Sequence, residues 1–387
     1  MYPTNDPVAR GFATCFPCGE LGTLDLLLNV ALFIPFGALL GWQSSRHSIV
    51  LYAAVISAAV SLAIEITQLV AIVGRAPSLA DVLANTAGGI TGAAAVTLTP
   101  RIWRGTPAAW RFLTWSWVLV GAAVLLFGAW AVELHVPYET YYVQWMPRRP
   151  TYAPFTGRLL NFSLDGSALT PGGVLQPSDL PPTFFKGQSA FAAAVMPGER
   201  PPRTALIARL ALSSREFFML GRQRDALVVR YRTNARRVGL RSPMHALDKA
   251  FGGGAQDDVR VEVVRQRTVV QLHAITPASE LRSVQRMSAA RLWASLLPLD
   301  RGLGPLGILG DVVWLGCLFL PAAFGGARGH AGLAALLPAF GLALCYGAIA
   351  VAFQQALLWW PLYLGIAVGV TAGFWLGIAP RTVKTSH

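Results

Sequence analysis

Seven stretches of about 20 mostly apolar residues constrain this 387-residue chain more than any other feature. A helix of that length crosses the ~30 Å hydrocarbon core of a bilayer. Composition agrees, because 54% of the residues are hydrophobic and only 13% are charged, unlike an ordinary soluble domain. The sequence therefore predicts a multi-pass membrane protein. The predicted spans are 23–42, 49–73, 79–98, 113–134, 305–323, 332–353 and 356–379.

Basic residues in the short loops predict the orientation of these spans, since such loops stay in the cytoplasm. With the N-terminus outside, the cytoplasmic loops and tail contain Arg46, Arg101, Arg104, Arg111, Arg328, Arg381 and Lys384. The C-terminus is then cytoplasmic, and the long polar segment after the fourth span is extracytoplasmic. The net charge of +13 is shared between the loops and this segment, and no nucleic-acid motif accompanies it, so we expect no nucleic-acid partner.

The tail at 1–22 contains the motif C-x-x-C at Cys15 and Cys18. On the oxidising side of a membrane these two residues could form a local disulfide. A zinc site would require two more ligands, and none are near in the sequence. We therefore expect no metal and no cofactor. A start outside the membrane without a signal segment is unusual, so either the tail crosses unaided or a helix precedes it.

The polar segment contains short β-branched runs with alternating faces, which predict an antiparallel β-sandwich over 155–277. We expect a connector at 135–154 and an amphipathic helix within 278–304. From 200 to 267 there are fifteen Lys and Arg residues against six Asp and Glu residues. This excess favours an anionic partner, such as phospholipid headgroups or a phosphorylated glycan. A solvated basic sheet surface explains it equally well.

The last three spans resemble the first three. LDLLLNVALFIPFG at 24–37 aligns with GDVVWLGCLFLPAA at 310–323, which matches Asp25 with Asp311. TAGGITG at 86–92 aligns with TAGFWLG at 371–377, with one residue of slip. These matches predict a degenerate parallel repeat, although apolar segments also match by chance. The second copy has Leu315 where the first has Asn29.

Polar residues in and near the first three spans mark a candidate site. An acidic or basic residue at the centre of a membrane helix costs roughly 2.5–3.5 kcal/mol, so such residues usually face a bundle interior or a cavity. Residues three or four positions apart share a helix face, and the external turn between spans two and three brings both spans together. The predicted cluster consists of Asn29, Glu65, Gln68, Arg75, Asp81 and Asn85.

This cluster is open to three interpretations. As a binding site, it would hold a polar headgroup or sugar, with Arg75 on a phosphate or carboxylate. As a catalytic site, it would use Glu65 as a general base with Asp81 to orient it. As a purely structural feature, it would contribute interhelical hydrogen bonds worth ~0.6 kcal/mol each.

The stretches LLNVALFIPFG, IEITQL and RAPSLADVLANTAGGITG resemble the VanZ-like family over about residues 21–98. The resemblance implies a bacterial multi-pass protein of the cytoplasmic membrane, in a family named for an accessory factor in glycopeptide, especially teicoplanin, resistance. It also implies that the six clustered residues occupy the family's characteristic polar positions. The polar segment resembles a concanavalin A or laminin G type sandwich in its strand spacing and in the turn LDGSALTPGG. Such folds often bind glycans.

Together these observations predict a membrane all-α helical bundle with an extracytoplasmic all-β sandwich. The leading functional hypothesis is an envelope protein that binds lipid headgroups or cell-wall glycan at the outer leaflet. The alternatives are an intramembrane transferase or hydrolase acting on a lipid-linked glycan, and a structural scaffold. The predicted domains are 1–22 (tail), 23–112 (VanZ-like unit), 113–134 (fourth helix), 135–154 (connector), 155–277 (sandwich), 278–304 (amphipathic connector) and 305–387 (degenerate copy).

Overall fold

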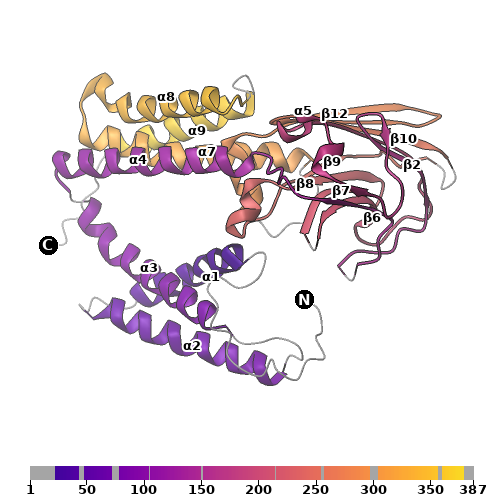
Figure 1. The fold of residues 1–387 in the computed structure, drawn as a ribbon. Helices are drawn as coiled ribbons and strands as arrows, with labels where there is room; N and C mark the ends of the chain where they lie inside the picture. Colours follow the sequence, from indigo (N-terminus) through magenta and orange to yellow (C-terminus); the bar gives the residue numbers. More distant parts are fainter. Residues whose placement is uncertain are drawn as a thin grey trace. The chain divides into compact units, whose positions relative to one another are not determined.

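A computed structural model describes nine stretches of the chain and divides it into two compact units (Figure 1). The first unit consists of residues up to Thr106 together with Arg236–Arg241, and the second contains the other residues. Each unit is considered by itself below. The described stretches are 22–42, 48–71, 78–103, 105–149, 151–213, 215–253, 257–296, 304–355 and 360–378.

Within these stretches, seven helices are long and apolar enough to cross a membrane, which confirms the predicted multi-pass architecture. Three of them form the first unit: α1 (Gly22–Trp42), α2 (Ile49–Ala71) and α3 (Leu79–Trp103). The other four are α4 (Pro107–Val132), α7 (Gly304–Gly329), α8 (Leu337–Ala352) and α9 (Trp360–Ile378). The orientation of the helices in the membrane stays a prediction.

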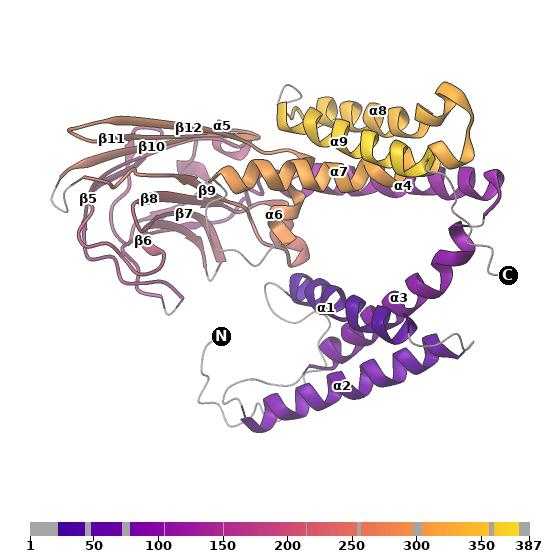
Figure 2. The same ribbon diagram turned by 180° about the vertical axis from the view of Figure 1, so that it is seen from behind.

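In the first unit, α3 packs against both α1 and α2 (Figure 2). Its contact with α1 is close because glycines line both helices. A Cβ atom added at Gly37 would lie 2.0 Å from the carbonyl oxygen of Gly89, and one added at Gly92 would lie 2.0 Å from that of Ile34. Small residues allow membrane helices to approach until their backbones touch. The glycines of TAGGITG therefore set the distance between α1 and α3.

The second unit contains two six-stranded antiparallel sheets, which confirms the predicted all-β domain. The sheet orders are β4-β1-β6-β7-β8-β9 and β12-β11-β10-β5-β2-β3. The strands are β1 (Tyr141–Trp145), β2 (Arg158–Leu164), β3 (Ser167–Ala168), β4 (Val174–Leu175), β5 (Gln188–Met196), β6 (Ala205–Leu212), β7 (Arg215–Gln223), β8 (Ala226–Tyr231), β9 (Met244–Leu247), β10 (Val259–Gln266), β11 (Val269–Ile275) and β12 (Glu280–Arg286).

The core lies between the two sheets. In β10, Val259, Val261 and Val263 are buried while the residues between them are exposed, as period-two alternation requires. Phe191 of one sheet stacks on Phe218 of the other, with ring centroids 3.9 Å apart. The short helix α5 (Pro182–Phe185) adds Phe184 to this core. Burial of these side chains holds the sheets face to face.

The sandwich is longer than the sequence indicates. β1 lies in the stretch expected to be a connector at 135–154, and β12 lies in the stretch expected to be an amphipathic helix at 278–304. β12 is a strand because Glu280–Arg286 alternates in burial and pairs with β11 along its whole length. Helical structure in that region is confined to the short turn Ala289–Arg291 and to α6 (Leu292–Leu296), within the part described.

Hydrogen bonds attach the sandwich to the helices of the second unit. The backbone N–H of Asn234 donates to the carbonyl of Glu133, and its Nδ2 donates to that of Trp130, at 2.9 and 3.1 Å. On another strand pair, Thr268 donates to the carbonyl of Gln354 at 3.3 Å. The sandwich is therefore in contact with the C-terminal ends of both α4 and α8.

The α1–α3 and α7–α9 contacts share one geometry. A Cβ atom added at Gly373 would lie 2.3 Å from the carbonyl oxygen of Leu320, the residue that the sequence alignment matches with Ile34. Gly92 meets Ile34 in the same way, so the structure pairs Gly92 with Gly373. The sequence match pairs Gly92 with Gly377 instead, one helical turn away. The repeat of the helix pair is thus visible in the structure, with a corrected register for its last helix.

Candidate functional site

A line of polar residues runs along α2 at intervals of four. Ser57, Ser61 and Glu65 share one face of the helix, and all three side chains are buried. The rest of α2 is largely apolar and its large side chains are exposed, as on a helix that contacts lipid. This face of α2 therefore packs against protein.

The partners of this face lie on α3. The carboxylate Oε2 of Glu65 accepts a hydrogen bond from the backbone N–H of Ser78, immediately before α3, at 2.9 Å. One turn away on α2, and about two turns into α3, Nδ2 of Asn85 donates to Oγ of Ser61 at 2.8 Å. One turn further along both helices, Gly89 faces Ser57 so closely that an added Cβ would lie 1.9 Å from its hydroxyl oxygen. Three successive turns of α2 therefore contact α3.

α1 joins this arrangement through one hydrogen bond. Nδ2 of Asn29 donates to Oδ1 of Asp81 at 2.8 Å. Asp81 lies one turn before Asn85 on α3, so α3 connects the polar residues of α1 with those of α2. We call these groups the polar layer. It consists of Asn29, Ser57, Ser61, Glu65, Ser78, Asp81 and Asn85.

Four of the six residues expected from the sequence lie in the polar layer: Asn29, Glu65, Asp81 and Asn85. Arg75, the side chain of Gln68, and the pair Cys15 and Cys18 lie outside the described residues. The serines of α2 were not expected, nor was the hydrogen bond from the Ser78 N–H to Glu65, although Ser78 suits the start of the third span. Their sequence signal is the spacing of four from Glu65, together with a serine at the start of α3.

The start of α3 explains the position of the Glu65 carboxylate. The first N–H groups of a helix have no intrahelical acceptor, and the helix dipole is positive at this end. Oε2 of Glu65 satisfies one such group from a neighbouring helix. A carboxyl group has two oxygens, and each can accept more than one hydrogen bond.

Two polar atoms of the layer are buried without a partner among the described residues: Oδ1 of Asn85 and Oγ of Ser57. A buried polar atom without a hydrogen bond costs about 1–3 kcal/mol. If the polar layer served only to join the helices by hydrogen bonds, we would expect no buried polar atom without a partner. In the described stretches, the polar layer included, no group of three or more His, Cys, Asp or Glu side chains could hold a metal ion.

In the second unit, the counterpart of Asp25 is Asp311, and both of its carboxylate oxygens accept hydrogen bonds. Asp311 on α7 is buried, and its two oxygens accept hydrogen bonds from Nε of Arg291 at 3.1 Å and from Nε1 of Trp293 at 2.9 Å. Both donors belong to the segment that leads from the sandwich to α7. The chain's own connector therefore occupies this position in the second copy. Asp25 itself is exposed.

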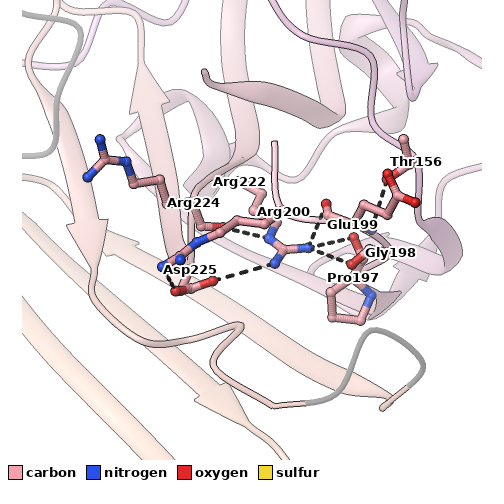
Figure 3. Close-up of polar contacts among 8 residues, drawn as sticks. All are labelled: Thr156, Pro197, Gly198, Glu199, Arg200, Arg222, Arg224 and Asp225. Carbon is pink, nitrogen blue, oxygen red and sulfur yellow. Dashed lines mark hydrogen bonds and ion pairs between the residues drawn. The ribbon is translucent and has the colours of Figure 1, made fainter. Parts of the chain in front are cut away.

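Arg222 is one of several buried arginines in the sandwich (Figure 3). Arg222 forms an ion pair with Asp225 at 3.6 Å, and Asp225 also pairs with Arg200. The Arg222 guanidinium connects the loop before β6 to β7 by hydrogen bonds to four carbonyl oxygens. Since these bonds and the Asp225 ion pair use its nitrogens, Arg222 is not a candidate for binding a ligand. The acceptors, at 2.7–3.2 Å, are the carbonyl oxygens of Pro197, Gly198, Glu199 and Arg224.

Comparison with known proteins gives one result. Residues 5–100 match the family model described as VanZ/LLP1, which is 96 of the 387 residues and includes all of the polar layer. A search of curated proteins and a search of solved structures found no match.

Proposed function

Because the chain contains a VanZ-like domain and is a multi-pass protein of the cell envelope, we propose that this domain binds a lipid headgroup or cell-wall glycan at the outer leaflet. In this proposal, binding protects cells against glycopeptides, teicoplanin in particular. Membrane lipids and lipid-linked sugars are the candidate ligands.

The observation that carries the proposal is the unpartnered Oδ1 of Asn85. The amide is 5% exposed, and its Nδ2 is already used by Ser61. A buried acceptor next to a layer of carboxylates and hydroxyls suits a ligand that donates hydrogen bonds, such as a sugar hydroxyl or a headgroup amine. Packing alone would favour an apolar residue at this position.

The depth of the layer is compatible with a ligand that enters from the membrane surface. Asn85 lies seven residues beyond Ser78, so it is ~10 Å along the helix axis from the start of α3. An extended headgroup or a disaccharide spans such a distance. We propose that Arg75, in the turn between α2 and α3, binds the phosphate or carboxylate of the same ligand.

We further propose that the sandwich recruits anionic glycan or lipid on the same side. Support comes from its excess of Lys and Arg, and from its contacts with the C-terminal ends of α4 and α8. In the expected orientation both of these ends lie outside. Since the sandwich is in contact with the helices, a binding test requires the full chain.

The test is teicoplanin susceptibility in cells that express the full chain. The variants are Glu65→Gln, Asp81→Asn and Asn85→Leu, with membrane levels matched by blot. Thr86→Val is the matched control, because the Thr86 hydroxyl donates only to the carbonyl of Val82 in its own helix. We expect wild type and Thr86→Val to raise the inhibitory concentration, and the three polar-layer variants to lose this protection.

Protection by all three variants at equal abundance would contradict the proposal and reduce the polar layer to helix packing. Lipid-linked glycan turnover that disappears in Glu65→Gln would replace it with the transferase or hydrolase alternative. Either result leaves the VanZ-like architecture unchanged.

A further inference from the structure

An arginine occupies a core position of the sandwich. β10 alternates between buried and exposed residues, and Arg265 follows Val261 and Val263 on the buried side. The Arg265 side chain is 1% exposed and is one of the largest fully buried side chains in the described part of the chain. Arginine is almost never fully buried unless it is paired. Its surroundings therefore require an explanation.

Arg265 has few partners. Its Nε donates to the carbonyl oxygen of Arg267 at 2.9 Å, and its guanidinium lies over the ring of Tyr231, 4.9 Å from the centroid. The two terminal nitrogens, Nη1 and Nη2, are buried and have no hydrogen-bond acceptor among the described residues. The hydroxyl group of Tyr231 is also buried, and the hydroxyl of Ser189 is its polar neighbour there. Arg222, in contrast, has its donors satisfied by four carbonyl groups.

No carboxylate among the described residues forms an ion pair with Arg265. Burial lowers the pKa of Arg265 to about 10, so its guanidinium is still protonated at pH 7. The nearby His245 is neutral, because burial lowers its pKa to about 3. Arg291, the other guanidinium that acts on His245, is paired with Asp311. One net positive charge thus stays in the interior, where an unpaired charge is strongly unfavourable.

We propose that Arg265 and Tyr231 bind a small inorganic anion between the two sheets. Nη1 and Nη2 supply donors that have no acceptor among the described residues. The hydroxyls of Tyr231 and Ser189, which lie close to each other, supply further donors, and Ser189 is directly opposite Arg265 on β5. Because Arg265, Tyr231 and Ser189 are all buried, the site suits an ion of one or a few atoms, such as chloride, rather than an organic anion.

The site lies in a hairpin that contacts a membrane helix. Thr268, three residues after Arg265, donates to the carbonyl of Gln354 at the end of α8. An anion that neutralises Arg265 would therefore stabilise the sandwich beside its contact with the helices. This role is independent of the ligand proposed for the polar layer.

The test is thermal unfolding of the full chain, purified in detergent in chloride-free gluconate buffer and followed by tryptophan fluorescence. Chloride is titrated, with bromide and phosphate in parallel arms. We expect chloride and bromide to raise the midpoint saturably by about 5 °C, the order expected for a site at roughly a hundred times its Kd. Phosphate should give no saturable rise, since the site is too small for it.

Arg265→Met should abolish the chloride dependence. The matched control is Arg267→Met, which removes an exposed guanidinium two residues away and keeps the carbonyl that Arg265 uses. It should keep the full shift. Tyr231→Phe keeps the ring under the guanidinium, removes one donor, and should raise the half-saturating chloride concentration about 3- to 10-fold.

Two outcomes would overturn the proposal. A wild-type midpoint equal in chloride and gluconate would mean that water alone solvates the guanidinium. A chloride shift that persists in Arg265→Met would place the anion elsewhere. If Arg265→Met does not fold, an unchanged half-saturating chloride concentration in Tyr231→Phe would overturn the proposal instead.

Discussion

The close contact of α1 with α3 makes Gly92→Ala a sharp test of the packing. The added Cβ would lie 2.0 Å from the carbonyl oxygen of Ile34 and 2.6 Å from the backbone nitrogen of Ala38. Ordinary contact begins at 3.4 Å, so the helices must separate by more than 1 Å. Overpacking of this kind costs about 1–3 kcal/mol. Better helix propensity returns up to ~1 kcal/mol, so we expect a net loss of up to ~2 kcal/mol.

The control is Gly347→Ala on α8, where nothing lies within 4 Å of the added Cβ. This variant should gain up to ~1 kcal/mol from helix propensity. Both free energies of unfolding can be measured by titrating the protein in mixed micelles with SDS. Gly373→Ala, the structural counterpart of Gly92, should lose stability like Gly92→Ala. Equal stability of Gly92→Ala and Gly347→Ala would refute the packing, and a neutral Gly373→Ala would refute the corrected repeat.

Three further predictions concern buried ionisable side chains. Asp311→Asn leaves Arg291 without its carboxylate and should cost about 3–5 kcal/mol in SDS titration, whereas Asp25→Asn, at an exposed position, should cost under ~0.5 kcal/mol. His245, with its pKa lowered to about 3 by burial, binds a proton in the unfolded state near pH 6.5 but not in the folded state. Stability should therefore fall by up to ~1.4 kcal/mol per pH unit as pH decreases from 6.5 toward 3, and His245→Asn should flatten that slope in unfolding measured against pH. Arg222→Met removes the donor that four carbonyl groups share and should cost roughly 2–3 kcal/mol in thermal unfolding.

The two copies of the helix pair use their matched acid differently. Asp311 is bonded to Arg291 and Trp293 from the segment after β12, so it fastens the connector to α7. Asp25 is exposed, and the polar layer lies one turn below it at Asn29. The first copy thus keeps polar groups for a ligand, in our proposal, where the second uses its acid for attachment.

Much of the architecture follows from local pattern. The seven helices follow from apolar stretches long enough to span hydrocarbon, and most strands follow from alternating burial in runs such as Val259–Gln266. β12 was missed because arginines among apolar residues suit an amphipathic helix as well as an edge strand, and only pairing with β11 decides between them. β1 was missed because its stretch is short and lies between Pro137 and Pro147, and prolines are typical of a connector.

The sequence by itself determined which side chains had to be shielded from lipid. Asp81 and Asn85 share one face of α3 by their spacing, and Glu65 lies in the neighbouring span α2. A charge or an unpaired amide in hydrocarbon is costly, so these side chains must face protein. Only the tertiary structure decided what each one contacts: the N–H of Ser78 for Glu65, and no described carboxylate for Arg265. The physical reason is that periodicity sets the direction of a side chain along its own element. The residue opposite it depends on how separate elements pack, and a one-turn shift such as that of α9 changes every partner.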